Sequence, residues 1–196
     1  MQNQSIKYRK GKRLSISGES SNSDIATYST EANGTCGDNV TWELKDGILT
    51  ISGNGTMDDF VIVKDDNTGQ IIESESHPCP WENDKGKIKE VYIKDGVTKV
   101  GARAFSDCYS LTKVVIGNSV KSIGEYAFKN CTSLTEIKLP AQLTNIGESA
   151  FYGCTGVENI TIPETVKTIG SYAFARCTGI NAITFNGDAP EIQEGA

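Results

Sequence analysis

Residues 111–131 read LTKVVIGNSVKSIGEYAFKNC, and the same pattern returns every 23 residues through the second half of the chain. A period between about 20 and 50 residues is the signature of a solenoid, in which each coil packs only on its neighbours. The recurring positions are a glycine (Gly101, Gly124, Gly147, Gly170), an alanine and a phenylalanine (Ala104-Phe105, Ala127-Phe128, Ala150-Phe151, Ala173-Phe174) and a cysteine (Cys108, Cys131, Cys154, Cys177).

Two hydrophobic periods share each coil. Val114 and Ile116 alternate with Lys113 and Val115, which is the pattern of a strand with one buried face. Residues 120–128 have apolar side chains three and four positions apart, which is typical of a short helical turn. We therefore predict an α/β solenoid of 23-residue coils, each with one parallel strand and one short helix or 3₁₀ turn.

The repeat also resembles a known family. The pattern Leu-x-x-Ile-x-Ile-Pro-x-x-Val-x-x-Ile-Gly-x-x-Ala-Phe-x-x-Cys is nearly intact from Val157 to Cys177 and is similar to the BspA-like, treponemal-type leucine-rich repeat. The segments 35–42, 49–53 and 80–81 look like the region that precedes such repeats. This resemblance implies a secreted or surface protein of bacteria or some protists, reported as an adhesin or host-binding protein, and it implies no catalytic residues.

We expect three parts along the chain. Residues 1–33 are rich in Ser, Asn, Thr and Glu and are predicted to form a disordered polar arm. Residues 34–85 are predicted to form an N-terminal β-hairpin cap, and residues 86–196 the leucine-rich repeats. Ala196 is the equivalent of Ala173, so we expect the array to be truncated at its C-terminal end.

The cap is predicted from its turns. Asp46-Gly47 favours the positive φ angles of a two-residue type I′ turn, so residues 42–51 are predicted to be a hairpin. A second hairpin is predicted from residues 60–63 to residues 71–72. Because an open solenoid exposes the apolar face of its first coil, we expect Trp42 and Trp81 to cover that face.

Charge and hydropathy exclude some classes of partner. The net charge is −6; residues 1–13 carry +5 with no acidic residue, which leaves −11 for the rest of the chain, so nucleic acid is not expected to bind the solenoid. No run of about 18 apolar residues is present, so no membrane span is predicted. The basic start resembles the first part of a signal peptide, but no apolar stretch follows it, which leaves a polar arm or the remnant of an export signal.

The four repeated cysteines are predicted to be a structural ladder. At equivalent places in successive coils they would stack about 4.8 Å apart, buried and reduced. No Cys-x-x-Cys pair or nearby histidine accompanies them, so no metal is predicted. Cys36 and Cys79 lie outside the ladder, and either a disulfide or two free thiols is possible there.

The sequence has no complete catalytic or metal-binding motif. His77 is the single histidine and lies in a proline-rich loop, so a catalytic pair with Cys79 is not predicted. Residues 65–67 partly match a calcium loop, but Gln70 and Ser76 stand where its glycine and bidentate glutamate belong. We therefore predict no catalytic residue, no metal and no cofactor.

The remaining candidate for a functional site is the outward face of the repeated strands. The outward strand positions are expected to form two columns on the concave side, where solenoids commonly bind, although they also fit a merely solvated sheet face. The first column is Glu90, Lys113, Glu136, Asn159 and Ala182, and the second is Tyr92, Val115, Lys138, Thr161 and Thr184.

The sequence thus predicts a non-catalytic binding module of a secreted or cell-surface protein. The partner is expected to be a host or community protein or a glycan, held through the repeat face of a monomer. The alternative hypotheses are the targeting region of a modular cell-wall enzyme whose catalytic domain lies outside this chain, and a structural spacer.

Overall fold

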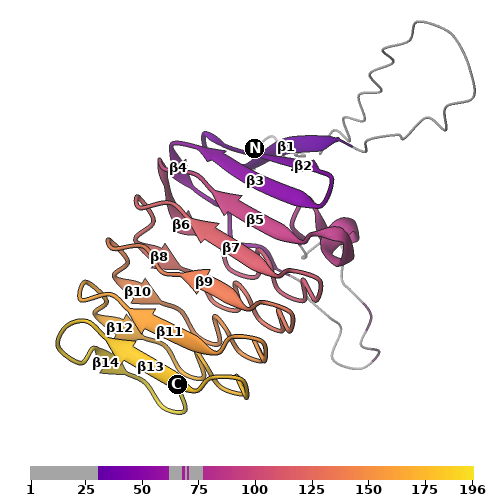
Figure 1. Ribbon diagram of the computed structural model, residues 1–196. Coiled ribbons are helices and arrows are strands. Elements are labelled where there is room, and N and C mark those ends of the chain that lie inside the picture. The colour runs from indigo at the N-terminus through magenta and orange to yellow at the C-terminus, as the bar shows by residue number, and fades with distance from the viewer. Residues whose placement is uncertain (1–30, 62–67, 69, 71–76) are drawn as a thin grey trace, which may run out of the picture.

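The computed structural model describes residues 31–61, 68, 70 and 77–196. The chain winds through stacked coils, and each complete coil contributes one strand to the front of the molecule and a second strand behind it (Figure 1). The prediction of a solenoid of 23-residue coils with parallel strands is confirmed, because the strands pair in register at that interval.

The strands form three sheets, and the described residues contain one 3₁₀ helix, η1 (Glu82–Lys87). The first sheet comprises, in spatial order, β1 (Ala32–Gly37), β2 (Val40–Lys45), β3 (Ile48–Gly53), β5 (Glu90–Ile93), β7 (Lys113–Ile116) and β9 (Glu136–Lys138). The second comprises β4 (Gly55–Thr56), β6 (Val97–Val100), β8 (Ser122–Ile123), β10 (Asn145–Ile146), β12 (Thr168–Ile169) and β14 (Glu191–Ile192). The third comprises β11 (Asn159–Ile162) and β13 (Ala182–Phe185).

The prediction of a short helix or 3₁₀ turn in each coil is confirmed only in part, because residues 88–196 contain hydrogen-bonded turns at this place and no helix. Residues 120–128 contain the two-residue strand β8 followed by turns. Some of their backbone N–H groups donate three residues back, as Ala127 does to the carbonyl of Gly124 at 3.3 Å. Others donate to neighbouring coils: Gly124 to the carbonyl of Val100 at 2.9 Å, and Phe128 to the carbonyl of Ala150 at 2.8 Å. Tyr126 also has a φ of 55°, in the left-handed region that no right-handed helix contains. Bonds between coils therefore alternate with 3₁₀-type bonds inside the turn, and no continuous helix forms.

The core is a stack of aromatic rings surrounded by aliphatic side chains. Neighbouring ring centroids lie between 5.2 and 5.7 Å apart, with interplanar angles of 18° or less. The indole N–H of Trp81 donates to the carbonyl of Ala104 at 2.8 Å, so this fully buried ring has its polar group satisfied. The stack runs in the order Trp81, Phe105, Phe128, Phe151 and Phe174.

The N-terminal strands continue the repeat sheet. β2 and β3 are antiparallel and joined at Asp46 and Gly47, which have φ angles of 51° and 84°, so the hairpin lies where the sequence predicted it. β3 then pairs in parallel with β5, which joins the hairpin to the first repeat. Trp42 packs edge-on against Trp81, with ring centroids 5.7 Å apart, and so helps to cover the first coil.

Some predictions about the N-terminal region fall outside the described residues. Residues 1–30 of the predicted arm and most of the predicted hairpin at 60–72 belong to this group. β1 begins at Ala32, so the last residues assigned to the arm lie in a strand. Val61 forms an isolated antiparallel bridge with His77. The boundary between cap and repeats near residue 85 stays a prediction.

Candidate functional site

The predicted binding residues lie on the outer side of the front strands. Val91 and Val114 are buried, whereas Tyr92 is half-buried and Val115 is 39% exposed, because successive strand residues point to opposite faces. Register places Glu90 beside Lys113 and Tyr92 beside Val115. We call this outer side of β2, β3, β5, β7, β9, β11 and β13 the strand face.

The columns extend onto the hairpin, which the sequence analysis did not include. Ile48 pairs with Glu90 and Thr50 pairs with Tyr92, and both of these hairpin residues have accessible side chains. On the next strand, Glu43 and Lys45 continue the same two columns. Apolar and polar residues alternate on either side of the Asp46-Gly47 turn, and this sequence pattern could have predicted that these side chains lie on the accessible face. A shallow hollow lies here, lined by Glu43, Lys45, Asp46, Ile48 and Thr50.

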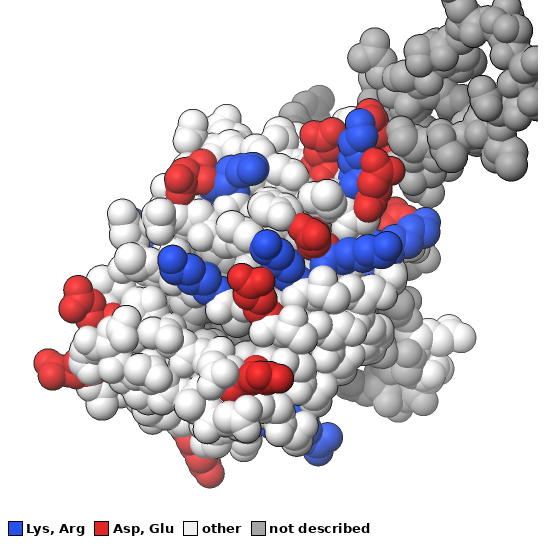
Figure 2. Space-filling view, viewed as in Figure 1, with Lys and Arg blue, Asp and Glu red and all other residues white. Residues whose placement is uncertain are grey.

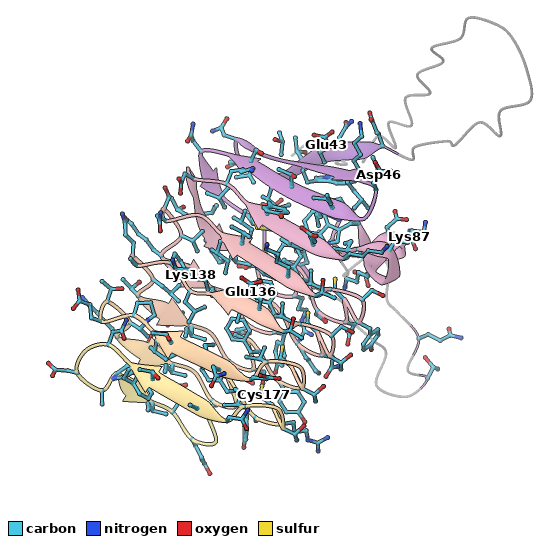
Figure 3. The ribbon with its side chains drawn as sticks, viewed as in Figure 1. Glu43, Asp46, Lys87, Glu136, Lys138 and Cys177 are labelled. Atoms are coloured by element: carbon cyan, nitrogen blue, oxygen red, sulfur yellow. The ribbon has the colours of Figure 1, made fainter. Side chains whose placement is uncertain are left out.

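Charge divides the strand face into two zones. In the charged zone, over β2 to β9, the column from Glu90 through Lys113 to Glu136 alternates in sign at each strand. Figure 3 shows Glu136 and Lys138 on the front of this zone, with Glu43 near its hairpin end. The hydroxyl zone, over β11 and β13, carries uncharged side chains, and Figure 2 shows few charges there; its column residues are Asn159, Thr161, Ala182 and Thr184.

Tyr92 is held in place at the centre of the charged zone. Its hydroxyl donates to a carboxylate oxygen of Glu90 at 2.7 Å, and the ammonium of Lys94 lies 5.4 Å from its ring centroid. The hydrogen bond to Glu90 raises the pKa of the Tyr92 hydroxyl, so the hydroxyl remains a donor at neutral pH. A half-buried ring that is fixed by these contacts suits contact with a ligand.

The two zones belong to different sheets. The pairing of Lys113 with Glu136 continues the first column, but Asn159 begins a separate sheet, so the predicted columns are interrupted between β9 and β11.

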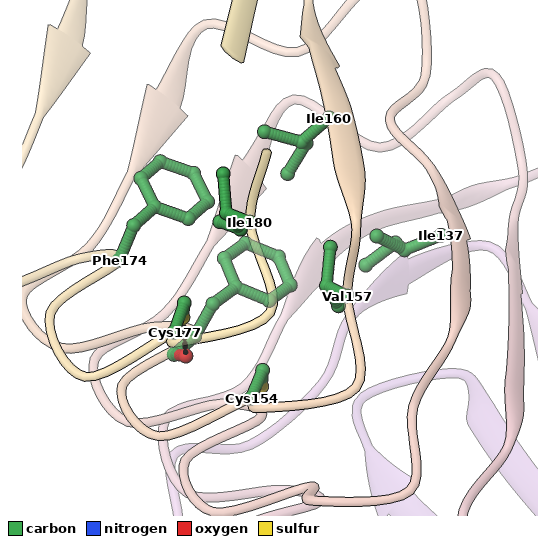
Figure 4. Close-up of a pocket in the computed structure, with 8 residues that line it drawn as sticks. Ile137, Cys154, Val157, Ile160, Phe174, Cys177 and Ile180 are labelled. Atoms are coloured by element: carbon green, nitrogen blue, oxygen red, sulfur yellow. Dashed lines mark hydrogen bonds between the residues drawn. The ribbon is translucent and has the colours of Figure 1, made fainter. Parts of the chain in front are cut away.

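Ile137, which points inward from β9, is half-buried at this place. The core beneath it contains a small apolar space among Ile137, Val157, Ile160 and their neighbours (Figure 4). That space has no room for a water-sized molecule, so it is a packing defect and not a ligand pocket.

The repeated cysteines lie behind the strand face and are free thiols. The Cys131 thiol donates to the carbonyl of Phe105 at 3.2 Å, and the Cys154 thiol donates to the carbonyl of Phe128 at 3.1 Å. Burial raises the pKa of Cys108 to about 12 and that of the half-buried Cys177 to about 11. Cys108 and Cys177 are therefore protonated at neutral pH, and the thiols of Cys131, Cys154 and Cys177 each link their coil to the one before it.

Cys36 and Cys79 are also free and buried. The Cys79 thiol donates to a carboxylate oxygen of Glu82 at 3.1 Å. Burial raises the pKa of Cys36 to about 12 and also raises that of Cys79. Of the two arrangements left open by the sequence, the structure has the unpaired one.

The described residues form neither a metal site nor a membrane-spanning helix. Across residues 31–61, 68, 70 and 77–196, no three His, Cys, Asp or Glu side chains are grouped as a metal site would require. The candidate calcium loop at 65–67 lies outside those ranges. Within the same ranges, no helix has the length and apolar character needed to cross a membrane.

The stacked 23-residue coils with a parallel strand face define a leucine-rich-repeat solenoid. A family model described as the BspA type leucine rich repeat region matches residues 82–196 in six copies. Because this match covers more than half of the chain, the protein belongs to the BspA-type leucine-rich repeat family. The resemblance read from the sequence is confirmed.

Solved bacterial structures have the same fold. A leucine-rich repeat protein from Eubacterium ventriosum is 25% identical with a TM-score of 0.56, and the alignment covers 80% of this chain and 44% of that one. One from Bacteroides ovatus is 30% identical with a TM-score of 0.52, covering 75% and 40%. A leucine rich cell surface protein from Faecalibacterium prausnitzii is 28% identical with a TM-score of 0.50, covering 75% and 41%. The chain thus spans less than half the length of these relatives, and a search of curated proteins found no match.

Proposed function

We propose that this chain is a non-catalytic binding module of a secreted or cell-surface protein, acting as a monomer in adhesion to a host or community protein or glycan. The observation that carries the proposal is the strand face, where accessible side chains from successive strands align in register. Solenoids commonly bind on such extended sheet surfaces. Similarity to the cell surface protein of Faecalibacterium prausnitzii supports the location.

The chemistry of the charged zone fits a macromolecular ligand. Ile48 and Val115 are 41% and 39% exposed, and they lie among Tyr92 and alternating charges. Protein interfaces combine accessible aromatic and aliphatic groups with a polar surround in this way. Alternating charges contribute chiefly to orientation and specificity, because a misplaced ligand brings like charges together.

The test reverses the positive charges of the strand face. Lys113→Glu combined with Lys138→Glu joins Glu90 and Glu136 in one acidic run, which is expected to weaken binding of an acidic ligand and change its salt dependence. Exposed strand substitutions usually change stability by under about 0.5 kcal/mol, so the array should stay folded. Binding is measured on an array of glycans and a panel of extracellular host proteins.

The matched control makes the same charge change elsewhere. Lys121 and Lys167 are exposed at the entrances to β8 and β12, in the second sheet, and are reversed together in the control variant. A ligand that loses affinity for the strand-face variant and not for the control supports the proposal. Unchanged affinity of a ligand that binds this chain would exclude the charged zone as its binding surface.

A further inference from the structure

The turns that follow the short strands carry a row in which cations and tyrosine rings alternate. We call it the cation–tyrosine row, and it consists of Arg103, Tyr126, Lys129, Tyr152 and Arg176. The Arg103 guanidinium lies 4.4 Å from the Tyr126 centroid, and the Lys129 ammonium lies 5.3 Å from Tyr126 and 5.7 Å from Tyr152. The Arg176 guanidinium lies 5.5 Å from Tyr152, so the row runs without a break over four coils.

The backbone fixes this row in place. Arg103, Tyr126 and Arg176 have φ angles of 58°, 55° and 58°, a conformation that is uncommon for residues other than glycine. Bonds between coils hold two of these turns: Arg103 N–H donates to the carbonyl of Glu125, and Tyr126 N–H donates to the carbonyl of Glu148, both at 2.9 Å. A row supported in this way is preorganised, which lowers the entropic cost of binding.

The cations of the row retain their hydrogen-bonding capacity. Among the described residues, ion pairs are formed by Lys45, Lys85, Lys87 and Lys99, and none by Arg103, Lys129 or Arg176. Guanidinium groups stacked on a ring keep their edge donors directed outward, and these donors match a carboxylate in a bidentate pair. Because cations already lie over the rings of Tyr126 and Tyr152, those rings offer less free surface for stacking on a sugar.

Nearby acidic groups restrict which anion fits. Glu148 accepts a hydrogen bond from the Tyr126 hydroxyl at 2.9 Å, and Asp107 accepts one from the Asn130 amide at 2.8 Å. Glu125 is exposed and directly precedes Tyr126. Its carboxylate would repel a polyanion that brings negative charge to every part of the row. The row therefore suits a ligand whose carboxylates are spaced to meet the cations.

We propose that the cation–tyrosine row binds an extended acidic peptide segment of a partner protein, independently of the strand face. Arg103 and Arg176 come from coils three steps apart, and coils stack about 4.8 Å apart, so these cations are offset by about 14 Å along the solenoid axis, with an added sideways offset because Arg176 lies four positions later in its coil. An extended chain rises about 3.4 Å per residue, so carboxylates at positions i and i+4 span the same distance on one side of the peptide. Tyr and Arg are also the side chains that dominate binding energy in protein interfaces.

The test uses a fluorescent peptide of about ten residues with glutamates at i and i+4, and the same peptide with glutamines. Fluorescence anisotropy with the whole chain is expected to show binding of the acidic peptide alone. The combined variant Arg103→Gln and Arg176→Gln should weaken that binding about tenfold or more, because it removes both bidentate donors. Tyr152→Leu, which leaves every charge in place but removes the ring between Lys129 and Arg176, should also weaken it.

Two controls separate the row from general electrostatics. Lys121→Gln with Lys167→Gln removes the same number of exposed charges outside the row, and Tyr109→Leu removes a 54% exposed ring that is not part of it. Circular dichroism on each variant shows that it is folded. The proposal is overturned if the controls weaken binding as much as the row variants, if the chain binds neither peptide, or if a sulfated oligosaccharide outcompetes the peptide in a row-dependent way. Because Lys113→Glu with Lys138→Glu should leave this binding unchanged, the outcome is independent of the strand-face proposal.

Discussion

At the scale of single residues, the repeated phenylalanine packs each coil against its two neighbours. Phe128 is fully buried, and its ring centroid lies 5.2 Å from that of Phe105 and 5.3 Å from that of Phe151. Each ring thus contacts the coil before it and the coil after it. The next residue, Lys129, has a different role, because its ammonium lies over the rings of Tyr126 and Tyr152.

Phe128→Ala is expected to lower the free energy of unfolding by about 3 to 5 kcal/mol, because it removes a buried ring and leaves a cavity. Lys121→Ala, at an exposed position of the same coil, should change it by under about 0.5 kcal/mol. Chemical denaturation monitored by circular dichroism compares the two. Equal effects would mean that the inward face of the coil has been misassigned.

The cysteines should react according to their burial and pKa. In the folded protein near pH 8, Cys108, Cys131 and Cys154 are expected to label very slowly with a soluble maleimide, because they are buried and burial raises the pKa of Cys108 to about 12. Cys177 is half-buried and should label first among the four. Mass spectrometry of timed samples gives the rates, with unfolded protein as the control. Rapid labelling of Cys131, or a disulfide between two of the four, would contradict the ladder.

At the scale of elements, the turn after each short strand depends on the close approach of two coils. A Cβ atom on Gly124 would lie 2.6 Å from the backbone nitrogen of Ala102 in the preceding coil. One on Gly170 would lie 2.6 Å from the nitrogen of Glu148, and Gly147 is similarly close to Glu125. The repeated glycine is therefore a consequence of coil spacing.

Gly124→Ala should destabilise the protein by about 1 to 3 kcal/mol, since the neighbour that it meets is backbone and cannot rotate away. Gly86→Ala is the control, because a Cβ there meets nothing within 4 Å, and it should be neutral or stabilise by up to about 1 kcal/mol. Thermal unfolding of both variants tests this. If Gly124→Ala were as stable as Gly86→Ala, the coils would be more loosely stacked than the structure shows.

At the scale of the whole molecule, the coils differ because they have different neighbours. The central strand β7 has partners on both sides, whereas β13 pairs with β11 alone. Every residue of β13 is exposed, including Ile183 and Phe185, each at 39%. In a solenoid the stability of a coil depends on its interfaces, so the last coil has the least support.

Amide hydrogen exchange should follow this difference. We expect β13 and β14 to exchange fastest among the strands of the repeats, and β7 and β8 to be the best protected, because local opening requires less buried surface to be exposed at the end. Mass spectrometry of peptic fragments measures it. The β2–β3 hairpin, which is paired on both sides, serves as the internal reference. Uniform protection from β5 to β14 would show that the array opens only as one unit.

The sequence alone determined the coil, its length, its parallel strand and its inward residues. Those features repeat locally, so a period of 23 residues fixes both the register between coils and which side chains face inward. The alternation around Val114 was sufficient to place Lys113 and Val115 on the accessible side. The Asp-Gly pair likewise located the hairpin, since few residues tolerate that turn.

Only the tertiary structure decided the rest. Residues 120–128 have a helical hydrophobic period, yet part of their backbone bonds go to neighbouring coils, and no local pattern records a partner that lies 22 or more residues away. The interruption between β9 and β11 also depends on how two coils meet and not on either sequence. The cation–tyrosine row was hidden for the same reason, because it is assembled from left-handed turns in four coils and its neighbours meet only after the coils have stacked.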